Sequence, residues 1–160
     1  MKVWKITASV VVVAAIAGGA AWYWFDRSVD STASVSIDAT DAEMVALGRR
    51  VYAAECAACH GANLEGEPNW RERMANGRLP APPHDASGHT WHHADDLLFA
   101  LTKYGIAEVT GRPVDTDMPA YETVLTDREI AAVLAYIKSR WPAEIRKRHD
   151  AMNRNQAKTR

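Results

Sequence analysis

Apolar residues follow two different patterns along this chain, one typical of a membrane segment and one typical of amphipathic helices. Residues 6–25 contain no charged side chain, and at about 1.5 Å per residue they form a helix long enough to cross a bilayer. Between residues 41 and 141, apolar positions recur every three or four residues in three separate stretches, as in helices that bury one face. The pattern predicts an N-terminal transmembrane helix followed by an all-α domain of three or more helices.

The apolar segment is predicted to remain as an anchor. Lys2 and Lys5 precede it and are expected to stay in the cytoplasm. Cleavage as a signal peptide is the alternative, because residues 18–21 have the small side chains of a cleavage site. The aromatic run at 22–25 favours the anchor, since such residues gather at membrane interfaces. We therefore expect residues 1–25 to hold the chain at the inner (cytoplasmic) membrane.

A tether and then the first helix of the domain are predicted next. Residues 26–40 are rich in serine, threonine and aspartate, and they have too few apolar side chains to form a core. Thr40 and Glu43 have the spacing of a capping box, which marks a helix start. The apolar positions of this helix are Met44, Leu47, Val51 and Ala54. The helix is predicted to run directly into residues 56–60.

Two further helices are predicted, each with its own boundary signals. The second begins with the acids at 95–96, which suit a first turn, and ends at Gly105. Its apolar positions are Leu97, Leu98, Leu101 and Tyr104. The third opens with a capping box of Thr126 and Glu129 and is expected to stop or kink at Pro142. Its apolar positions are Ile130, Val133, Leu134, Ile137 and Trp141.

Charge is distributed unevenly, although the net charge is only −1. Residues 26–139 carry ten basic and eighteen acidic side chains, whereas residues 140–160 carry seven basic and two acidic ones. Residues 142–160 are also poor in apolar side chains, and we predict a basic tail outside the core. An acidic body with a basic tail indicates attraction to an anionic membrane or an acidic partner and no binding of nucleic acid. A solvated extension is the alternative for the tail.

Cys56 and Cys59 are the only cysteines, and with His60 they form a Cys-x-x-Cys-His sequence. This spacing is typical of covalent haem c attachment, with two thioether bonds from the cysteines and an iron ligand from the histidine. A closed zinc site is excluded, because it takes four ligands and usually two cysteine pairs. A thioredoxin-like dithiol is disfavoured, because that motif belongs to a βαβ unit and no strand pattern surrounds Cys56. The chain is predicted to carry one covalent haem c.

Met118 is the predicted second axial ligand of the haem iron, opposite His60. Such a ligand must approach the other haem face, so it should lie far along the chain in irregular structure. Met118 is 58 residues after His60, and Pro119 favours an extended backbone there. The other methionines lie in the first helix, soon after His60 or outside the domain: Met44, Met74, Met1 and Met152. Four histidines remain alternatives for the iron or for another metal ion: His84, His89, His92 and His93.

Together, these features resemble the class I monohaem cytochromes c, in a membrane-anchored form of bacterial type. The residues that carry the resemblance are Gly48, Tyr52, the haem sequence at 56–61, the Asp-Met-Pro-Ala-Tyr run at 117–121, and Tyr136. The resemblance covers residues 41–141. It implies that Gly48 lets the last helix of the domain cross the first closely, and that Tyr52 packs against Tyr136.

The stretch from residue 61 to residue 90 is rich in proline and glycine and is expected to wrap around the haem as a long loop. The resemblance implies that a proline carbonyl in this loop accepts the Nδ1 hydrogen bond of His60, as metal-bound histidines require. Pro82 and Pro83 are both candidates. Indole and guanidinium groups suit haem propionates, and the candidates are Trp70, Arg71 and Arg78, with solvated loop residues as the alternative.

With His60 and Met118 both bound, the iron would have no vacant position, and Met/His ligation raises the reduction potential. The predicted function is therefore one-electron transfer between membrane-associated or periplasmic redox proteins, without catalysis and with the haem domain facing the periplasm. Two alternatives remain. One is a haem subunit of an oxidase or dehydrogenase complex, and the other is a haem enzyme or sensor with a displaceable methionine.

Overall fold

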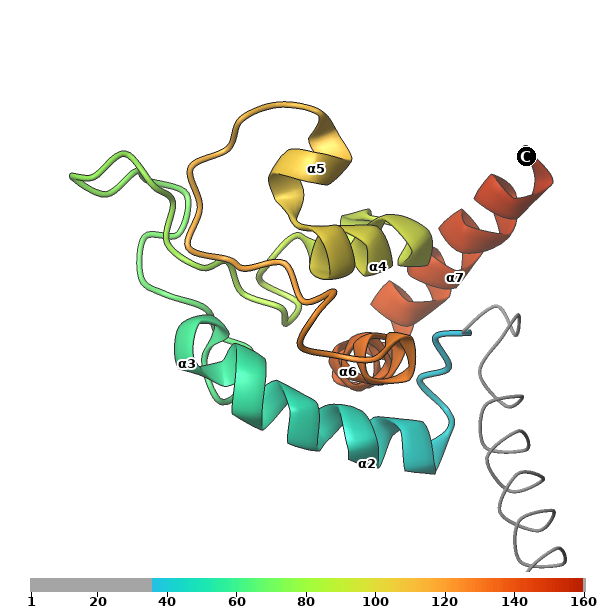
Figure 1. The fold of residues 1–160 in the computed structure, drawn as a ribbon. Coiled ribbons are helices and arrows are strands. Elements are labelled where there is room, and N and C mark those ends of the chain that lie inside the picture. Colours follow the sequence, from blue (N-terminus) through green and yellow to red (C-terminus); the bar gives the residue numbers. More distant parts are fainter. Residues whose placement is uncertain (1–35, 160) are drawn as a thin grey trace, which may run out of the picture. The chain divides into compact units, whose positions relative to one another are not determined.

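The computed structural model of the protein describes residues 36–159. In this part of the chain the backbone forms helices and no β-strand. In chain order they are α2 (Ala42–Val51), the π-helix η1 (Tyr52–Cys56), α3 (Ala57–His60), the 3₁₀ turn η2 (Thr90–His92), α4 (Asp95–Tyr104), α5 (Ile106–Thr110), α6 (Asp127–Ser139) and α7 (Ala143–Lys158) (Figure 1). The predicted all-α fold is confirmed for these residues. The predicted anchor at 1–25 lies outside them, and within 36–159 no helix has the length and apolar character needed to span a bilayer.

The helices α2 and α6 cross at Gly48. A Cβ atom on Gly48 would lie 1.9 Å from the carbonyl oxygen of Ala132 in α6, so no larger residue fits without moving a backbone. One turn after Gly48, at the start of η1, the ring of Tyr52 packs against that of Tyr136 with centroids 5.5 Å apart. Both predicted roles are confirmed. The crossing fixes the end of α2 that leads into Cys56.

The core is built around α6, which is buried along most of its length. Its start is the predicted capping box, in which the Thr126 side chain and Glu129 satisfy each other's backbone N–H groups. The buried core residues are Val51, Tyr52, Leu64, Leu98, Ile130, Val133, Leu134, Ile137 and Trp141. In Figure 1, α2 and α4 lie on either side of α6. The helix ends at Ser139, so Trp141 belongs to the following turn and not to the helix, although it is buried as predicted.

Two details of the first helix differ from the prediction. The N-cap is Asp41, whose carboxylate accepts hydrogen bonds from the N–H groups of Glu43 and Met44, while Thr40 donates its hydroxyl to Asp38. An aspartate one residue later offers the same cap with a stronger acceptor. Ala54 is exposed, because the π-turn inserts an extra residue and rotates the following positions away from the buried face.

The C-terminal segment also differs from the prediction, because it is a helix docked on the domain. His149 is only 1% exposed, and Ile145 packs against the core. The Arg146 guanidinium donates to the carbonyls of Ser139 and Trp141, which closes the end of α6. A reading that counts only apolar residues misses this docking, since much of it consists of hydrogen bonds and ion pairs.

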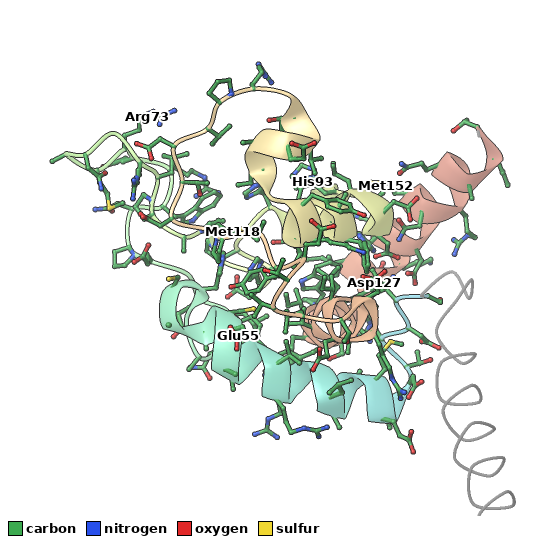
Figure 2. All side chains as sticks on the ribbon, viewed as in Figure 1. Glu55, Arg73, His93, Met118, Asp127 and Met152 are labelled. Atoms are coloured by element: carbon green, nitrogen blue, oxygen red, sulfur yellow. The ribbon has the colours of Figure 1, made fainter. Side chains whose placement is uncertain are left out.

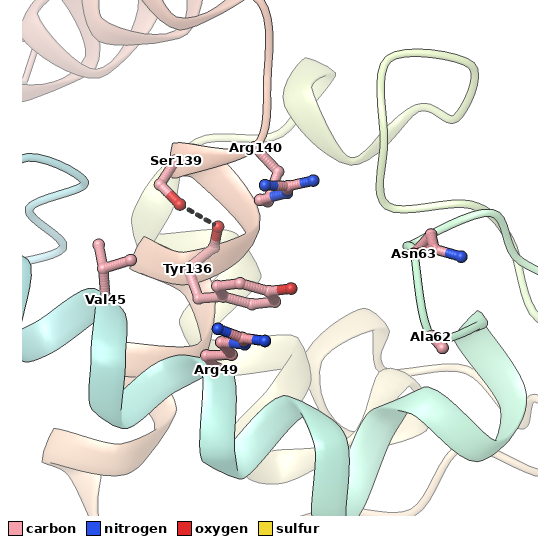
Figure 3. A pocket seen from close by; sticks show the side chains of 7 residues that line it. All are labelled: Val45, Arg49, Ala62, Asn63, Tyr136, Ser139 and Arg140. Atoms are coloured by element: carbon pink, nitrogen blue, oxygen red, sulfur yellow. Dashed lines mark hydrogen bonds between the residues drawn. The ribbon is translucent and has the colours of Figure 1, made fainter.

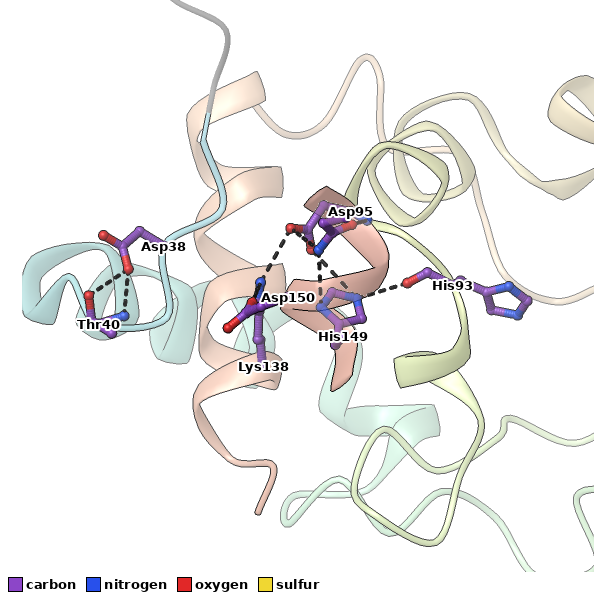
Figure 4. A network of polar contacts seen from close by, with 8 residues as sticks. Asp38, Thr40, His93, Asp95, Lys138, His149 and Asp150 are labelled. Carbon is purple, nitrogen blue, oxygen red and sulfur yellow. Dashed lines mark hydrogen bonds and ion pairs between the residues drawn. The ribbon is translucent and has the colours of Figure 1, made fainter. Parts of the chain in front are cut away.

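A polar network joins α7 to the start of α4 and to α6 (Figure 4). The ring Nε2 of His149 donates to the His93 carbonyl at 2.8 Å, and Asn153 donates to the Asp95 carboxylate at 2.7 Å. Lys138 of α6 pairs with Asp95 at 3.3 Å and with Asp150 of α7 at 2.8 Å. Burial lowers the pKa of His149 below its usual value despite the neighbouring Asp95 carboxylate. His149 is therefore neutral at pH 7 when it holds α7 in this network.

Candidate haem site

The Cys-x-x-Cys-His residues lie where the α-helix α2 passes into the wider π-helix η1, which is followed by the short α-helix α3. The N–H of Ala57 bonds to the carbonyl of Tyr52, five residues earlier, as in a π-turn. Such wider turns are often found at functional sites. Cys56 ends this turn half-buried against the core, and Cys59 is exposed. Both are free thiols, so the motif is available to a ligand that bonds to sulfur.

The protonation of Cys56 disfavours the dithiol alternative. Burial, with smaller contributions from the nearby Glu55 and Cys59, raises the pKa of this thiol to about 11. Redox-active Cys-x-x-Cys sites instead have a cysteine with a lowered pKa, because the thiolate is the nucleophile.

His60 is held with one ring nitrogen committed and the other free. Its Nδ1 lies 2.8 Å from the carbonyl oxygen of Pro82. A carbonyl can only accept, so Nδ1 carries the hydrogen and Nε2 keeps the lone pair that a metal needs. Burial lowers the pKa of His60, although the Pro82 carbonyl opposes this shift, and the imidazole is neutral at pH 7. The structure thus selects Pro82 over Pro83 as the acceptor.

The loop that carries Pro82 is fastened by backbone bonds. The N–H of Gly66 donates to the His60 carbonyl at 2.8 Å, and the N–H of His84 donates to the Leu64 carbonyl at 2.8 Å. The Trp141 indole donates to the His84 carbonyl at 2.8 Å, which ties the loop to the end of α6. Gly66 has φ of +68°, and a Cβ there would lie 2.5 Å from the nitrogen of Pro83. The loop therefore closes tightly on the residues that orient His60.

Met118 lies half-buried on the segment that connects α5 to α6 (Figure 2). The Tyr121 hydroxyl, three residues further on, donates to the carbonyl of Glu55 at 2.8 Å. Glu55 is the residue before Cys56, so this bond ties the Met118 segment to the haem sequence. The N–H of Tyr121 also donates to the Thr102 carbonyl of α4 at 3.1 Å.

Arg78 joins the two loops. Its guanidinium pairs with Asp115 at 2.7 Å and also with Asp117, the residue before Met118. These carboxylates raise the pKa of Arg78. Arg78 was a candidate partner for a haem propionate, and in the structure it contacts protein carboxylates. Sequence reasoning missed this pairing, because charges 37 and 39 residues apart give no local signal.

Each of the four alternative histidines contacts another ring, and His89 and His93 contact each other with centroids 5.5 Å apart. The ring of His84 stacks on His60 with centroids 4.0 Å apart, so it lies on the same side as His60 and not opposite it. His92 stacks on Trp91, and His89 stacks on Trp70. Arg71 also lies over the Trp70 ring. Within residues 36–159, no group of three histidine, cysteine or acidic side chains gathers as a separate metal site would require.

One buried hydrogen-bond donor lacks an acceptor. The indole N–H of Trp91 has no hydrogen-bond partner among the described residues, and a buried N–H without an acceptor is costly. A carboxylate from a bound group would satisfy it, and haem carries two propionates. The free Nε2 of His60 beside two thiols and this unpaired indole donor are chemically compatible with a bound haem. No sequence pattern had singled out Trp91.

A surface pocket between α2, α6 and the turn after α3 is separate from these residues (Figure 3). Its lining includes Arg49, Tyr136 and Arg140, and it contains neither cysteine and no methionine. The pocket is therefore not part of the candidate haem site, which comprises the haem sequence and the two loops.

A comparison with protein families supports this assignment. The family model described as cytochrome c matches residues 45–141. Searches of curated proteins and of solved structures gave no match. The family binds haem c covalently and transfers electrons. Since the matched residues span more than half of the chain and contain both loops of the site, the chain belongs to the cytochrome c family.

Proposed function

We propose that this protein is a class I cytochrome c that carries one haem, bound through Cys56 and Cys59, and passes single electrons between redox proteins at the periplasmic face of the inner membrane. The observation that carries the proposal is the hydrogen bond from His60 Nδ1 to Pro82, which leaves Nε2 free beside two unpaired cysteines. Residues 1–25 serve as the anchor in this proposal, on the strength of their uncharged sequence and its aromatic end.

Bound haem supplies an iron that alternates between ferric and ferrous states. The chain's residues decide how this iron is held. His60 would bind it through Nε2, and the Pro82 carbonyl fixes the ring orientation and would raise the basicity of the imidazole. Met118 would supply a neutral thioether, which favours the reduced state. With both residues bound to the iron, the site would transfer electrons and would have no position open for a substrate.

Two measurements on the purified holoprotein test the proposal. Acid-acetone should fail to extract the haem, and intact mass should exceed the chain by one haem; extraction of the haem would refute covalent attachment. The oxidised wild type should show the weak thioether-to-iron absorption band at the red end of the spectrum. Met118→Ala should lose this band, have a lower reduction potential and bind carbon monoxide. A variant with the wild-type spectrum and potential would exclude Met118 as the ligand.

A further inference from the structure

The helix α7 has one face on the domain and an opposite face in solvent. The inward face contains Ile145 and His149. With 3.6 residues per turn, positions 147, 154 and 158 lie on the opposite side of the helix. The basic face of α7 consists of four exposed cations: Lys147, Arg148, Arg154 and Lys158.

This face has little opposing charge on its own helix. Glu144 is exposed in the first turn, where it favours the helix dipole, and the Asp150 carboxylate is engaged by Lys138. The arginine nearest the domain, Arg146, donates to the end of α6 and is only half-exposed. The four outward cations are therefore available to an anionic surface.

The position of α7 separates this face from the haem sequence. In Figure 1, α7 and α3 lie at opposite ends of the described domain. A redox partner bound to the basic face would thus be held away from Cys59, the exposed residue of the motif. Electron transfer favours short distances, so this face suits attachment better than electron exchange.

The chain enters the domain at the same end as α7. Lys138, which binds Asp150 of α7, is close enough to Asp38 to contribute to lowering its pKa. Figure 4 shows Asp38, Lys138 and Asp150 within one region. Asp38 is only 13 residues after the uncharged stretch that ends at Phe25. A short tether to a membrane would therefore keep this end of the domain near the lipid.

We propose that the basic face of α7 docks on an anionic phospholipid surface and turns the haem sequence away from the membrane. The proposal rests on the anchor in the proposed function. Lysine and arginine side chains next to a membrane are attracted to anionic headgroup phosphates within a Debye length. Four cations on one rigid helix face favour a fixed orientation over free rotation about the tether.

The full-length holoprotein can be tested in nanodiscs of phosphatidylcholine, with or without phosphatidylglycerol. A nitroxide is attached through Asn155→Cys, since Asn155 is exposed beside Arg154, and its accessibility to a neutral water-soluble relaxation agent is measured. Each cation contributes roughly a factor of five in surface affinity. Accessibility should fall about tenfold in anionic discs and recover in about 0.5 M salt.

The test variant carries Lys147→Glu, Arg148→Glu, Arg154→Glu and Lys158→Glu. A matched control reverses four exposed arginines elsewhere, Arg49, Arg50, Arg112 and Arg128. The test variant should stay accessible in anionic discs, and the control should be protected like the wild type. Equal accessibility in neutral and anionic discs would overturn the proposal, as would equal effects of the two variants; the face would then serve a protein partner or solvent.

The anchor is read out separately, by retention of the chain in neutral discs during gel filtration. If the chain were not retained, the anchor would be refuted, and protection of the nitroxide on added anionic vesicles would still test α7. Failure of the docking proposal and failure of the proposed anchor therefore give different results.

Discussion

The two loops of the haem site are fastened in different ways. The proximal loop, residues 61–89, is held by backbone hydrogen bonds around His60 and by the buried indole of Trp141. In the distal segment, residues 111–125, backbone bonds to α4 fasten the end at Tyr121 and Glu122. The part around Met118 depends on side chains, among them the pair of Arg78 with Asp115, whose side chains are 35% and 66% exposed. We infer that His60, the proposed first iron ligand, is fixed by the fold, whereas Met118, the proposed second ligand, is held by contacts that solvent and salt can weaken.

The largest expected loss of stability comes from a substitution in the proximal loop. Gly66→Ala forces a residue with φ of +68° to carry a Cβ that would lie 2.5 Å from Pro83 nitrogen and 2.7 Å from the carbonyl carbon of Pro82. Left-handed strain and overpacking together should lower the free energy of unfolding by about 3 kcal/mol. Denaturant unfolding of the holoprotein, followed by haem absorbance, measures this change.

Gly77→Ala is the matched control in the same loop. Its φ of +85° is equally left-handed, but nothing lies within 4 Å of the added Cβ. It should therefore cost only the backbone strain, about 1 kcal/mol. Equal losses in the two variants would show that the close approach of Gly66 to Pro82 is unimportant.

A smaller loss of stability is expected when a tyrosine hydroxyl is removed, either next to the proximal loop at Tyr52 or in the distal segment at Tyr121. Tyr52→Phe removes the hydroxyl that donates to the Gly61 carbonyl at 3.0 Å, and Tyr121→Phe removes the one that donates to Glu55 at 2.8 Å. Burial raises the pKa of Tyr121 to about 12, so its hydroxyl stays a donor across the usual pH range. Each variant should lose about 1 kcal/mol of stability.

The spectra should separate the two tyrosines. Tyr121→Phe should also weaken the thioether-to-iron band, because the Met118 segment loses its bond to the haem sequence, whereas Tyr52→Phe should leave the band unchanged. The same loss of the band in both variants would contradict the proposed difference between the loops.

Local sequence signals predicted the parts of the site that depend on neighbours in the chain. The haem sequence, the α6 capping box and the Gly48 crossing follow from spacing or from family resemblance. The remaining parts depend on contacts between distant residues. The choice of Pro82, the orphaned indole of Trp91 and the pairing of Arg78 with the Met118 segment required the folded chain. The docking of α7 was missed because polar side chains make much of that interface.

The third prediction concerns α7, which holds the start of α4 through Asn153 and Asp95. The helix α4 in turn supports the distal segment, because the Thr102 carbonyl accepts the N–H of Tyr121. His149 is buried with a lowered pKa, facing Asp95, Lys138 and Asp150. The unfolded chain therefore binds more protons near and below pH 6.5, so stability is present above that pH and falls as the pH falls. The slope from this one group is at most about 1.4 kcal/mol per pH unit.

Denaturant unfolding between pH 7.5 and about 5 measures this slope. His149→Gln should be less stable at pH 7.5 but should lose less stability on acidification than the wild type. The remaining histidines are present in both proteins, so the difference in slope isolates His149. Parallel pH curves would exclude a proton-linked role for this residue.

The smallest effect is expected from Arg78→Ala, because exposed ion pairs contribute little to global stability. The change should instead be local. Without Arg78, Asp115 and Asp117 repel each other beside Met118, so the segment should leave the iron more often. The thioether-to-iron band should weaken and carbon monoxide should bind faster, while the unfolding midpoint stays nearly constant.

Arg78→Lys is the matched control. It should restore only part of the band, since an ammonium cannot bind two carboxylates as a planar guanidinium does. Added salt should weaken the wild-type band, because it screens the ion pairs of Arg78, whereas it should not weaken the band of the alanine variant further, because there it screens only the repulsion between the two carboxylates. A salt-insensitive wild-type band would mean that other contacts hold the methionine.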